Sequence, residues 1–293
     1  MFAILGASGK VGRATINQLR AAGQPVRAVL HRADAAADLA AVGCEIAHAD
    51  IGEPASLTAA LAGATAIQVI CPVAFTASHA GDVMRAQIDH LVAALTRVRP
   101  LHVLAISDYG AELPSGSGVT LVFHYLEAAL RSVPGGLTLL RSCEQMQNWA
   151  RVVGVARRDG ILPSLHRPLD KLFPTVAAQD VGIAAADLLM ATPTGGAQRI
   201  VHIEGPRRYS ALDVAACLAR ILRRPVEATA LPPEGWHDVL TSAGLSASYA
   251  DLVVELFQAH NAGRIDAEIA AGPIRRGSIP LDNVLADLVA RLD

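Results

Sequence analysis

Three glycines near the start of the chain, in the segment GASGKVG, have the spacing of a loop that binds a dinucleotide pyrophosphate. Gly6, Gly9 and Gly12 lie between a short apolar run and an amphipathic run. Backbone N–H groups at the start of a helix stabilise phosphate charge, and glycines let phosphates approach the main chain. The pattern predicts a dinucleotide site; the alternative is a tight turn without a ligand. Lys10, inside the loop, either reaches a phosphate or stays solvated.

The residues after the second apolar run indicate which dinucleotide is bound. An acidic residue there binds the 2′-hydroxyl of NAD, whereas a basic one binds the 2′-phosphate of NADP. This chain has His31 and Arg32, so NADP(H) is preferred and NAD(H) remains possible; a plain surface arginine is the alternative. Asp50, in the segment HADI, is a candidate partner for the adenine amino group, or a turn residue.

The tyrosines of the chain lack the lysine that short-chain dehydrogenases use for proton exchange. In that dyad a lysine four residues after a tyrosine lowers the pKa of the tyrosine. Here Leu113 follows Tyr109 at this spacing, and Ala129 follows Tyr125. Alcohol oxidation by the dyad mechanism is therefore disfavoured. Hydride delivery to a quinone needs less acid–base help, because the hydroquinone oxygens can take protons from water.

Three side chains remain as candidate catalytic groups. Tyr109 and His124 are possible proton donors, although a histidine on a mostly apolar helix more often packs in the core. Lys171, in RPLDKLFP, would hold a substrate oxygen or lie in a surface loop. We find no metal-ligand spacing among the cysteines and histidines, and no Ser-His-Asp pattern.

Composition excludes several classes of partner. The 293 residues are 52% hydrophobic and 18% charged, with a formal net charge of −2. Near-balanced charge argues against binding of nucleic acid or an anionic membrane surface. The four cysteines are far apart, and the N-terminus has no secretion signal, so we expect a cytoplasmic protein. The segment Leu57–Gly81 carries no Asp, Glu, Lys or Arg, but its Gly, Pro and polar residues argue against a membrane span.

Short apolar runs alternate with helical patterns over the first half of the chain, which predicts a parallel sheet covered on both faces. The expected strands are Phe2–Leu5, Pro25–Leu30, Cys44–His48, Ala66–Ile70, Leu101–Ile106 and Leu137–Leu140. The expected helices are Val11–Ala22, Ala55–Ala62, Asp82–Val98 and Val119–Ser132, and most are followed closely by Gly or Pro.

The pattern of expected secondary structure changes near residue 150, where helices begin to dominate and prolines cluster. We expect a nucleotide-binding domain over 1–150 and a smaller, mostly helical unit over 151–293, with part of 175–205 free to rejoin the first sheet. The expected helices there are Asp180–Met190, Ala211–Leu222, Glu234–Ala243, Tyr249–His260 and Leu281–Leu292, and the expected strands are Ile200–Ile203 and Val226–Ala230.

The order of several segments resembles the NmrA-like proteins, an atypical branch of the short-chain dehydrogenase/reductase superfamily. The resemblance covers nearly the whole chain. It rests on GASGKVG, VRAVLHR, GCEIAHADIGEPASLTAALAGATAIQVI, AISDYGA, LTLLRSCEQMQN, AAQDVGIAAADLL and VHIEGPRRYSALDVAACLARILRRPVEATALPPEGW. It implies a Rossmann-type α/β fold that binds NAD(P)(H), with a small C-terminal domain closing a cleft over the nicotinamide.

The resemblance also implies positions for cofactor contacts. Those matching the pyrophosphate loop are Gly6, Ser8, Gly9, Lys10, Val11 and Gly12, and those matching the adenine site are Asp50 and Ile51. Two loops match those that face the ribose and nicotinamide: Cys71, Pro72 and Val73 after the fourth strand, and Ser107, Asp108 and Tyr109 after the fifth. The chain departs from many relatives at His31, where an arginine is common.

Function divides within the family that the chain resembles. Some members are NADPH-dependent quinone reductases, so our first expectation is hydride transfer from NADPH to a quinone or another flat acceptor. Others are redox-sensing regulators, so the alternative is a protein that binds NAD(P)(H) and a protein partner without turnover. A third possibility is an isomerase or ether reductase acting on an aromatic natural product.

Overall fold

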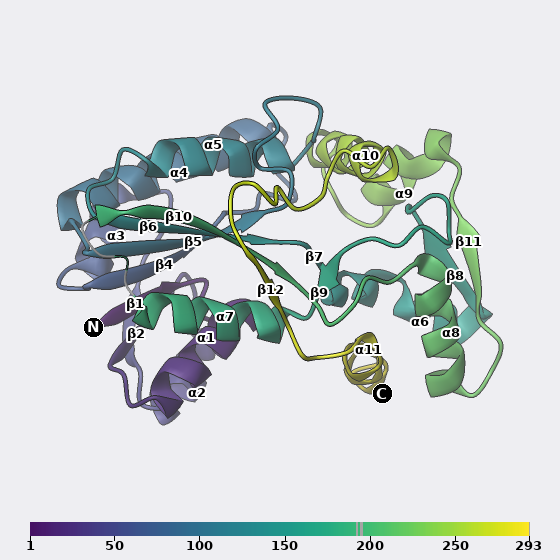
Figure 1. Ribbon diagram of the computed structural model, residues 1–293, viewed down its shortest axis with the longest axis horizontal. Coiled ribbons are helices and arrows are strands. Elements are labelled where there is room, and N and C mark those ends of the chain that lie inside the picture. Colours follow the sequence, from purple (N-terminus) through teal and green to yellow (C-terminus); the bar gives the residue numbers. More distant parts are fainter. Residues whose placement is uncertain (192, 194–195, 293) are drawn as a thin grey trace.

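A parallel sheet with strand order β12-β10-β6-β5-β4-β1-β2-β3 organises the computed structural model, which describes residues 1–191, 193 and 196–292 (Figure 1). Strand order reverses between β1 and β4, which is where open α/β sheets place ligands. The strands are β1 Phe2–Leu5, β2 Val26–Leu30, β3 Glu45–His48, β4 Ala66–Ile70, β5 His102–Asp108, β6 Gly136–Ser142, β10 Gln198–Glu204 and β12 Ile274–Arg276. The predicted α/β fold and its parallel sheet are confirmed, with strand ends displaced by one or two residues.

Helices cover both faces of the sheet because its strands are apolar on both sides. Along β5, Val103 and Ala105 belong to one buried cluster and Leu104 and Ile106 to the other. On the first face lie α3 Pro54–Leu61, α4 Ala80–Val98 and α5 Thr120–Leu130; on the second lie α1 Lys10–Ala21, α2 Ala36–Ala41 and α7 Ala178–Met190 (Figure 1). The two faces together form the main core.

Helix α7 returns from the second half of the chain to pack on α1. A Cβ at Gly182 would lie 2.5 Å from the Val11 carbonyl oxygen, so this glycine permits the close approach. Strand β10 then pairs with β6, and β12 pairs with β10. The expected return to the first sheet near residues 175–205 is therefore observed, and the segment 274–276 joins it.

The remaining elements lie outside the main sheet and are here called the smaller unit. They are α6 Ala150–Asp159, β8 Ile161–Ser164, α8 Ala211–Leu222, β11 Glu227–Ala230, α9 Trp236–Ser242, α10 Ala247–Asn261 and α11 Leu281–Ala290, with the pair β7 Glu144–Gln145 and β9 Thr175–Val176. Buried side chains of α6, α8 and α11 form a third apolar cluster, whereas those of α9 and α10 join the two clusters of the sheet. Short 3₁₀ helices span η1 Ala33–Ala35, η2 Met146–Trp149 and η4 Pro233–Gly235. Sequence reasoning missed α2, α6, β7, β8, β9 and β12, most of which are short.

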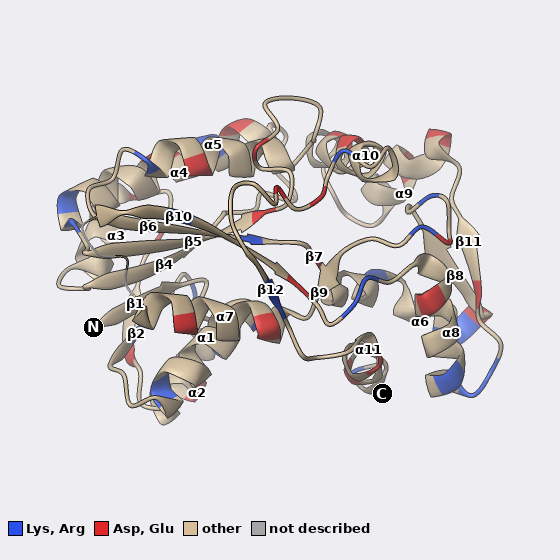
Figure 2. Cartoon of the chain, viewed as in Figure 1, with Lys and Arg blue, Asp and Glu red and all other residues tan. Residues whose placement is uncertain are grey.

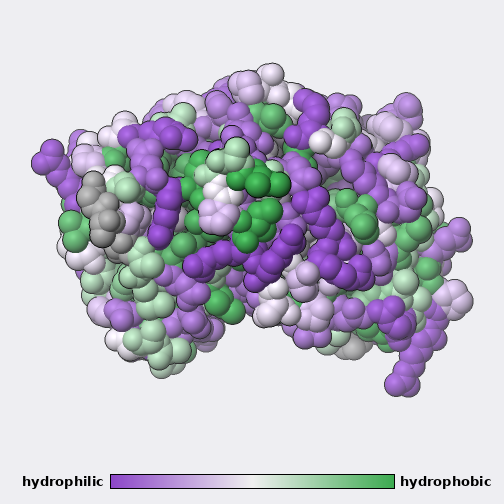
Figure 3. All heavy atoms as spheres, viewed as in Figure 1, coloured by the Kyte–Doolittle hydropathy of each residue, from purple (hydrophilic) through white to green (hydrophobic). Residues whose placement is uncertain are grey.

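Residues 262–273, here called the crossing segment, lead from the smaller unit back over the sheet to β12 (Figure 1). Apolar side chains gather near the middle of this view, beside strongly hydrophilic ones (Figure 3). Ile269 of the crossing segment is 76% exposed, whereas Ile265 is buried. Among the described residues, none of the helices has the length and apolar character that a membrane span requires.

Candidate cofactor and substrate site

The glycine-rich loop joins β1 to α1 in the geometry expected of a pyrophosphate site. The Gly9 N–H donates to the Gly6 carbonyl at 3.0 Å, and Gly6 has φ +71°, which favours glycine. A Cβ at Gly12 would lie 2.2 Å from the Gly6 oxygen, so Gly12 is needed for packing. A Cβ at Gly9 would approach only that oxygen, at 3.2 Å. Gly9 therefore leaves the start of α1 bare, as close approach of a phosphate requires.

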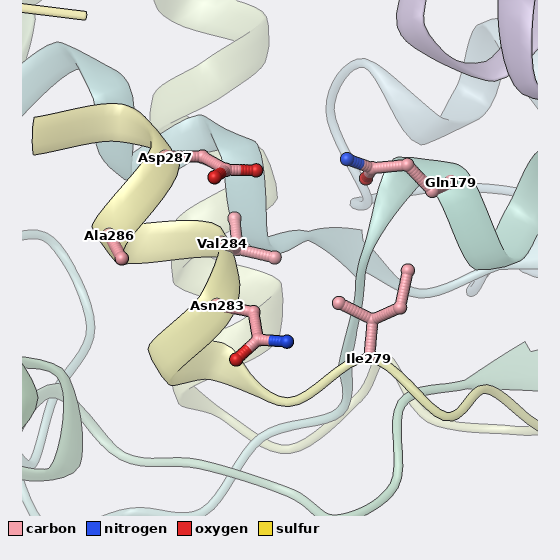
Figure 4. A pocket seen from close by; sticks show the side chains of 6 residues that line it. All are labelled: Gln179, Ile279, Asn283, Val284, Ala286 and Asp287. Atoms are coloured by element: carbon pink, nitrogen blue, oxygen red, sulfur yellow. The ribbon is translucent and has the colours of Figure 1, made fainter. Parts of the chain in front are cut away.

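The C-terminal helix α11 borders this loop. Lys10 and Arg291 line one small pocket together with Gln147 and Gln179. Partial burial and the charge of Arg291 lower the pKa of Lys10. Between α11 and the start of α7 lies a groove of about 410 Å³, and Figure 4 shows Gln179 opposite Asp287 across it. Lys10 and Arg291 thus place positive charge beside the predicted pyrophosphate position.

The expected ribose end of the site lies after β2. Arg32 is highly exposed, with 79% of its side chain accessible, and lies 3.5 Å from Asp34. Arg13, which sequence reasoning missed, donates from Nε to the Ser8 carbonyl at 3.1 Å and lies 3.6 Å from Asp38. The exposed residues His31 and Ser8 belong to the same two loops. Two guanidinium groups therefore lie near the loops that would hold a 2′-phosphate.

Asp50 forms the turn that we considered as its alternative role. Its Oδ1 accepts the Gly52 N–H at 2.7 Å, and its own N–H donates to the Ser56 hydroxyl at 3.0 Å. The Ile51 carbonyl oxygen lies 3.2 Å from Nδ1 of His90. The adenine contact of Asp50 and Ile51 stays a prediction beside this structural role.

The residues in the loops after β4 and β5 differ in how accessible their side chains are to a ligand. Cys71 is buried, and burial raises the pKa of its thiol far above the ordinary range. Pro72 is partly exposed. Ser107 is buried and donates its hydroxyl to Glu127 at 2.6 Å. The Ser107 side chain is thus engaged by the protein itself, which leaves its predicted nicotinamide contact to the backbone.

The three candidate catalytic groups each make a structural contact. The Tyr109 hydroxyl, 1% exposed, donates to Glu204 at 3.2 Å, and burial raises its pKa. The Lys171 ammonium donates to the carbonyl oxygens of His260 and Asn261 at 2.7 and 2.9 Å, so it caps the end of α10. Nδ1 of His124 lies 2.8 Å from the Ala111 carbonyl oxygen.

A buried ion-pair network, which sequence reasoning missed, lies beneath the end of β5. Arg141 donates from Nε and Nη2 to the two oxygens of Glu127, each at 2.8 Å. Its Nη1 donates to Glu112 at 3.1 Å and to Glu268 of the crossing segment at 2.5 Å. Arg141 is 3% exposed at its side chain, so these carboxylates compensate a nearly buried charge.

A second cluster of charges holds the crossing segment from its other side. The buried Glu204 accepts from Arg208 at 2.8 Å and from Arg276 at 2.6 Å. Arg208 also donates to Asp266 at 2.5 Å. In Figure 2, acidic and basic stretches meet where β12, β9 and β7 lie close together. The crossing segment is therefore tied to the carboxyl ends of the sheet strands by two ion-pair clusters.

Between the sheet and the smaller unit, acidic and aromatic residues face each other. Oε2 of Glu144, just after β6, lies 3.0 Å from Nε2 of His166, and that pair lowers the pKa of Glu144 despite burial. The His166 ring stacks on Phe173 with centroids 3.7 Å apart. Trp149 and Phe257 also contact the His166 ring. Trp149, His166 and Phe173 are all buried, so these rings form part of the core of the smaller unit.

Asp108, the last residue of β5, lies in the segment that the resemblance matches to a loop facing the ribose and nicotinamide, but it received no chemical role there. Its Oδ1 accepts the Tyr109 N–H and its Oδ2 accepts the Thr120 hydroxyl, both at 3.1 Å. The residue keeps part of its surface accessible. Burial raises its pKa to about 7, and the charges of Glu144 and Glu112 act in the same direction. The described residues contain no group of three or more His, Cys, Asp or Glu arranged to hold a metal.

Comparisons with known proteins place this geometry among NAD(P)H-binding proteins. A family described as NAD(P)H-binding matches residues 6–132. An NAD(P)H azoreductase of Xenophilus azovorans is 26% identical over 258 residues, covering 88% of this chain and 86% of its own. An NADPH-dependent quinone oxidoreductase of Escherichia coli, solved with NADPH, aligns with TM-score 0.79 and 22% identity over 99% of this chain and 100% of that one. A triphenylmethane reductase of Citrobacter sp. aligns with TM-score 0.78 and 18% identity, over 99% of each chain.

Proposed function

We propose that this chain, which resembles the NmrA-like branch of the atypical short-chain dehydrogenases/reductases, is an NADPH-dependent oxidoreductase that reduces a quinone or another flat, conjugated acceptor. The observation that carries this proposal is the bare amino end of α1 at Gly9, beside Lys10 and Arg291. When bound there, NADPH supplies a hydride. The protein contributes position, charge and exclusion of water.

The cofactor preference follows from the loop after β2. A 2′-phosphate needs donors with positive charge, and Arg32 presents an exposed guanidinium there, with Arg13 on the neighbouring helix. Asp34 and Asp38 hold these two side chains by weak ion pairs that a phosphate would replace. Similar solved structures hold NADPH or NADP(H), which supports the same preference.

Replacing Arg32 by alanine should raise the KM for NADPH by roughly 10- to 100-fold, because charge-assisted hydrogen bonds contribute about 1.5–3 kcal/mol. The KM for NADH should change less than about twofold, since NADH lacks the 2′-phosphate. Steady-state kinetics with both coenzymes measure the two values. Arg158→Ala, a change at another highly exposed arginine paired with an aspartate, is the matched control. Equal effects on NADPH and NADH would contradict the assignment of Arg32.

The acceptor class is supported by the similar proteins and by the missing dyad. Relatives named for azo, quinone and triphenylmethane reduction are named for flat, conjugated acceptors. The chain also lacks the Tyr-x-x-x-Lys dyad that alcohol oxidation and carbonyl reduction would use. A conjugated acceptor, which needs less acid–base help, agrees with both observations.

The decisive experiment is NADPH oxidation, followed by its absorbance, over a panel of a benzoquinone, an azo dye and a triphenylmethane dye. We expect turnover of at least one acceptor above a Gly9→Trp control. Binding of NADPH without turnover of any acceptor would replace this proposal by that of a cofactor-sensing regulator. Absence of binding would remove both.

A further inference from the structure

We propose that Asp108 is the catalytic acid that protonates the acceptor during reduction, an inference that rests on the oxidoreductase function proposed above. Asp108 ends β5 in the middle of the sheet, between β4 and β6. Its neighbour in register is Ser142, which ends β6. The carboxyl ends of these strands are where an open α/β sheet receives its ligand. The carboxyl group therefore lies at the floor of the expected reaction site, with part of the residue accessible.

Two hydrogen bonds orient the carboxyl group but leave some of its acceptor positions free. The Tyr109 N–H holds Oδ1, and the Thr120 hydroxyl at the start of α5 holds Oδ2. A carboxylate has about four acceptor positions, so each oxygen keeps one for a proton that it can pass on. Among the described residues, no arginine or lysine forms an ion pair with Asp108, in contrast with Glu112 and Glu127, which both bind Arg141.

The surroundings keep this carboxyl group available in its protonated form near neutral pH. Burial raises its pKa to about 7, and the two hydrogen bonds oppose the rise. An acid is most effective when its pKa lies close to the working pH. The charges that raise its pKa are Glu144 after β6 and Glu112 after β5. The charge of Asp108 in turn raises the pKa values of Cys71 after β4, Cys143 after β6 and Tyr249 of α10.

The other acids at this edge are less suited to the step. The His166 ring lowers the pKa of Glu144, which keeps that carboxylate ionised. Burial lowers the pKa of His260 to about 4, so its ring is neutral at pH 7. The Tyr109 hydroxyl has a raised pKa and donates to Glu204. Asp108 is thus the group whose titration matches neutral pH.

The chemistry balances for acceptors that gain both a hydride and a proton. NADPH is oxidised to NADP⁺ as its hydride forms a new bond to the quinone or azo group, which takes up the electron pair. The Asp108 O–H bond breaks, and its proton goes to the acceptor oxygen or nitrogen that carries the resulting negative charge. Water then returns a proton to the carboxylate. A triphenylmethane cation, in contrast, gains only a hydride and needs no proton.

This difference gives a direct test with Asp108→Asn. Rates of NADPH oxidation at pH 7 are compared for a quinone and for a triphenylmethane cation. General acid catalysis contributes about 10²–10⁴-fold, so the variant should lose at least tenfold more rate with the quinone than with the dye. Equal losses on both acceptors would overturn the proposal. If the unaltered protein consumes no NADPH with either acceptor, the proposed function and this inference are both overturned.

Two further variants separate proton donation from a structural role. Asp89→Asn is the matched control, because Asp89 also accepts a hydroxyl hydrogen bond, from Tyr125, but on the exposed face of α4. It should leave the ratio of the two rates unchanged. Thr120→Val removes a donor that stabilises the ionised form of Asp108. The rate of quinone reduction should fall as rising pH removes the proton of Asp108. Because Thr120→Val raises the pKa of Asp108, this fall should occur at higher pH in the variant. A pH profile equal to that of the unaltered protein would count against the proposal.

The protein without cofactor gives an independent readout. The folded pKa of Asp108, about 7, lies above its ordinary value of 3.8, so the folded state binds more protons between these values. Stability contributed by this group therefore falls as pH rises from about 4 to about 7. Asp108→Asn should raise the Tm at pH 8 more than at pH 4.5 relative to the unaltered protein. Parallel Tm curves would overturn the assignment whether or not any acceptor is reduced.

Discussion

Replacing Gly9 by tryptophan is expected to weaken NADPH binding by roughly 100-fold or more while leaving the fold intact. The backbone at Gly9, with φ −75° and ψ 167°, suits any residue. A Cβ there meets only the Gly6 carbonyl oxygen, at 3.2 Å, so a small shift admits it. The indole would then cover the N–H groups at the start of α1 that bind the pyrophosphate. Such a loss corresponds to about 2.7 kcal/mol or more of binding free energy.

Gly12 provides the comparison that makes this test specific. A Cβ at Gly12 would lie 2.2 Å from the Gly6 oxygen and 2.9 Å from the Ala7 Cα, which are backbone atoms that cannot yield cheaply. Gly12→Ala should therefore lower the Tm as well as NADPH affinity. Calorimetric titration and thermal unfolding of the two variants measure both effects. Full NADPH affinity in Gly9→Trp would remove the proposed cofactor position from this loop.

Sequence reasoning predicted the strand–turn–helix arrangement at this loop, and that arrangement has a local cause. The turn is closed by one hydrogen bond between residues three apart, Gly6 is favoured by its positive φ, and Gly12 is required by its contact with the Gly6 carbonyl oxygen. Likewise, the alternation of apolar runs fixes a parallel sheet because both of its faces are buried. These features depend on neighbours in sequence, so the pattern of residues is enough to predict them.

Roles that depend on distant partners escaped the same reasoning. The Lys171 ammonium binds carbonyl oxygens 89 and 90 residues away, and the Tyr109 hydroxyl binds Glu204 across 95 residues. Nothing in the residues around them reveals that these polar groups are occupied. The missing dyad was the available signal, because it showed that Tyr109 lacks the lysine that would make it a proton donor of the usual kind.

The role proposed for Asp108 could not be predicted from the sequence either. The segment AISDYGA is visible in the sequence, yet an aspartate at a strand end usually caps or turns the chain. Its raised pKa arises from burial and from Glu144 and Glu112. Only Glu112 is near in sequence, and burial is a property of the folded sheet. The environment, rather than the residue type, makes the side chain a candidate acid.

Replacing Glu127 by alanine is expected to destabilise the fold by about 3–5 kcal/mol, because it leaves the buried Arg141 without its main partner. Glu127 accepts from Ser107, at 2.6 Å, and twice from Arg141, and 4% of its side chain is exposed. Glu112 and Glu268 remain, but they bind a different nitrogen of the guanidinium, Nη1. Urea unfolding at pH 7 measures the change. A loss below about 1 kcal/mol, as in an exposed pair, would contradict this view of the network.

Two comparisons show whether burial of the charge is the cause. Glu45→Ala breaks the Arg27–Glu45 pair, in which 49% of the glutamate side chain is exposed, and should cost no more than about 1 kcal/mol. The double variant Glu127→Leu/Arg141→Met removes both buried charges and should recover part of the stability lost in Glu127→Ala, since an apolar pair of similar volume replaces them. Its Glu268 would lose the partner that ties the crossing segment to β6. Hydrogen exchange in residues 262–273 should therefore be faster in the double variant even where global stability recovers. This result would separate the contribution of the network to global stability from its attachment of the crossing segment to the sheet.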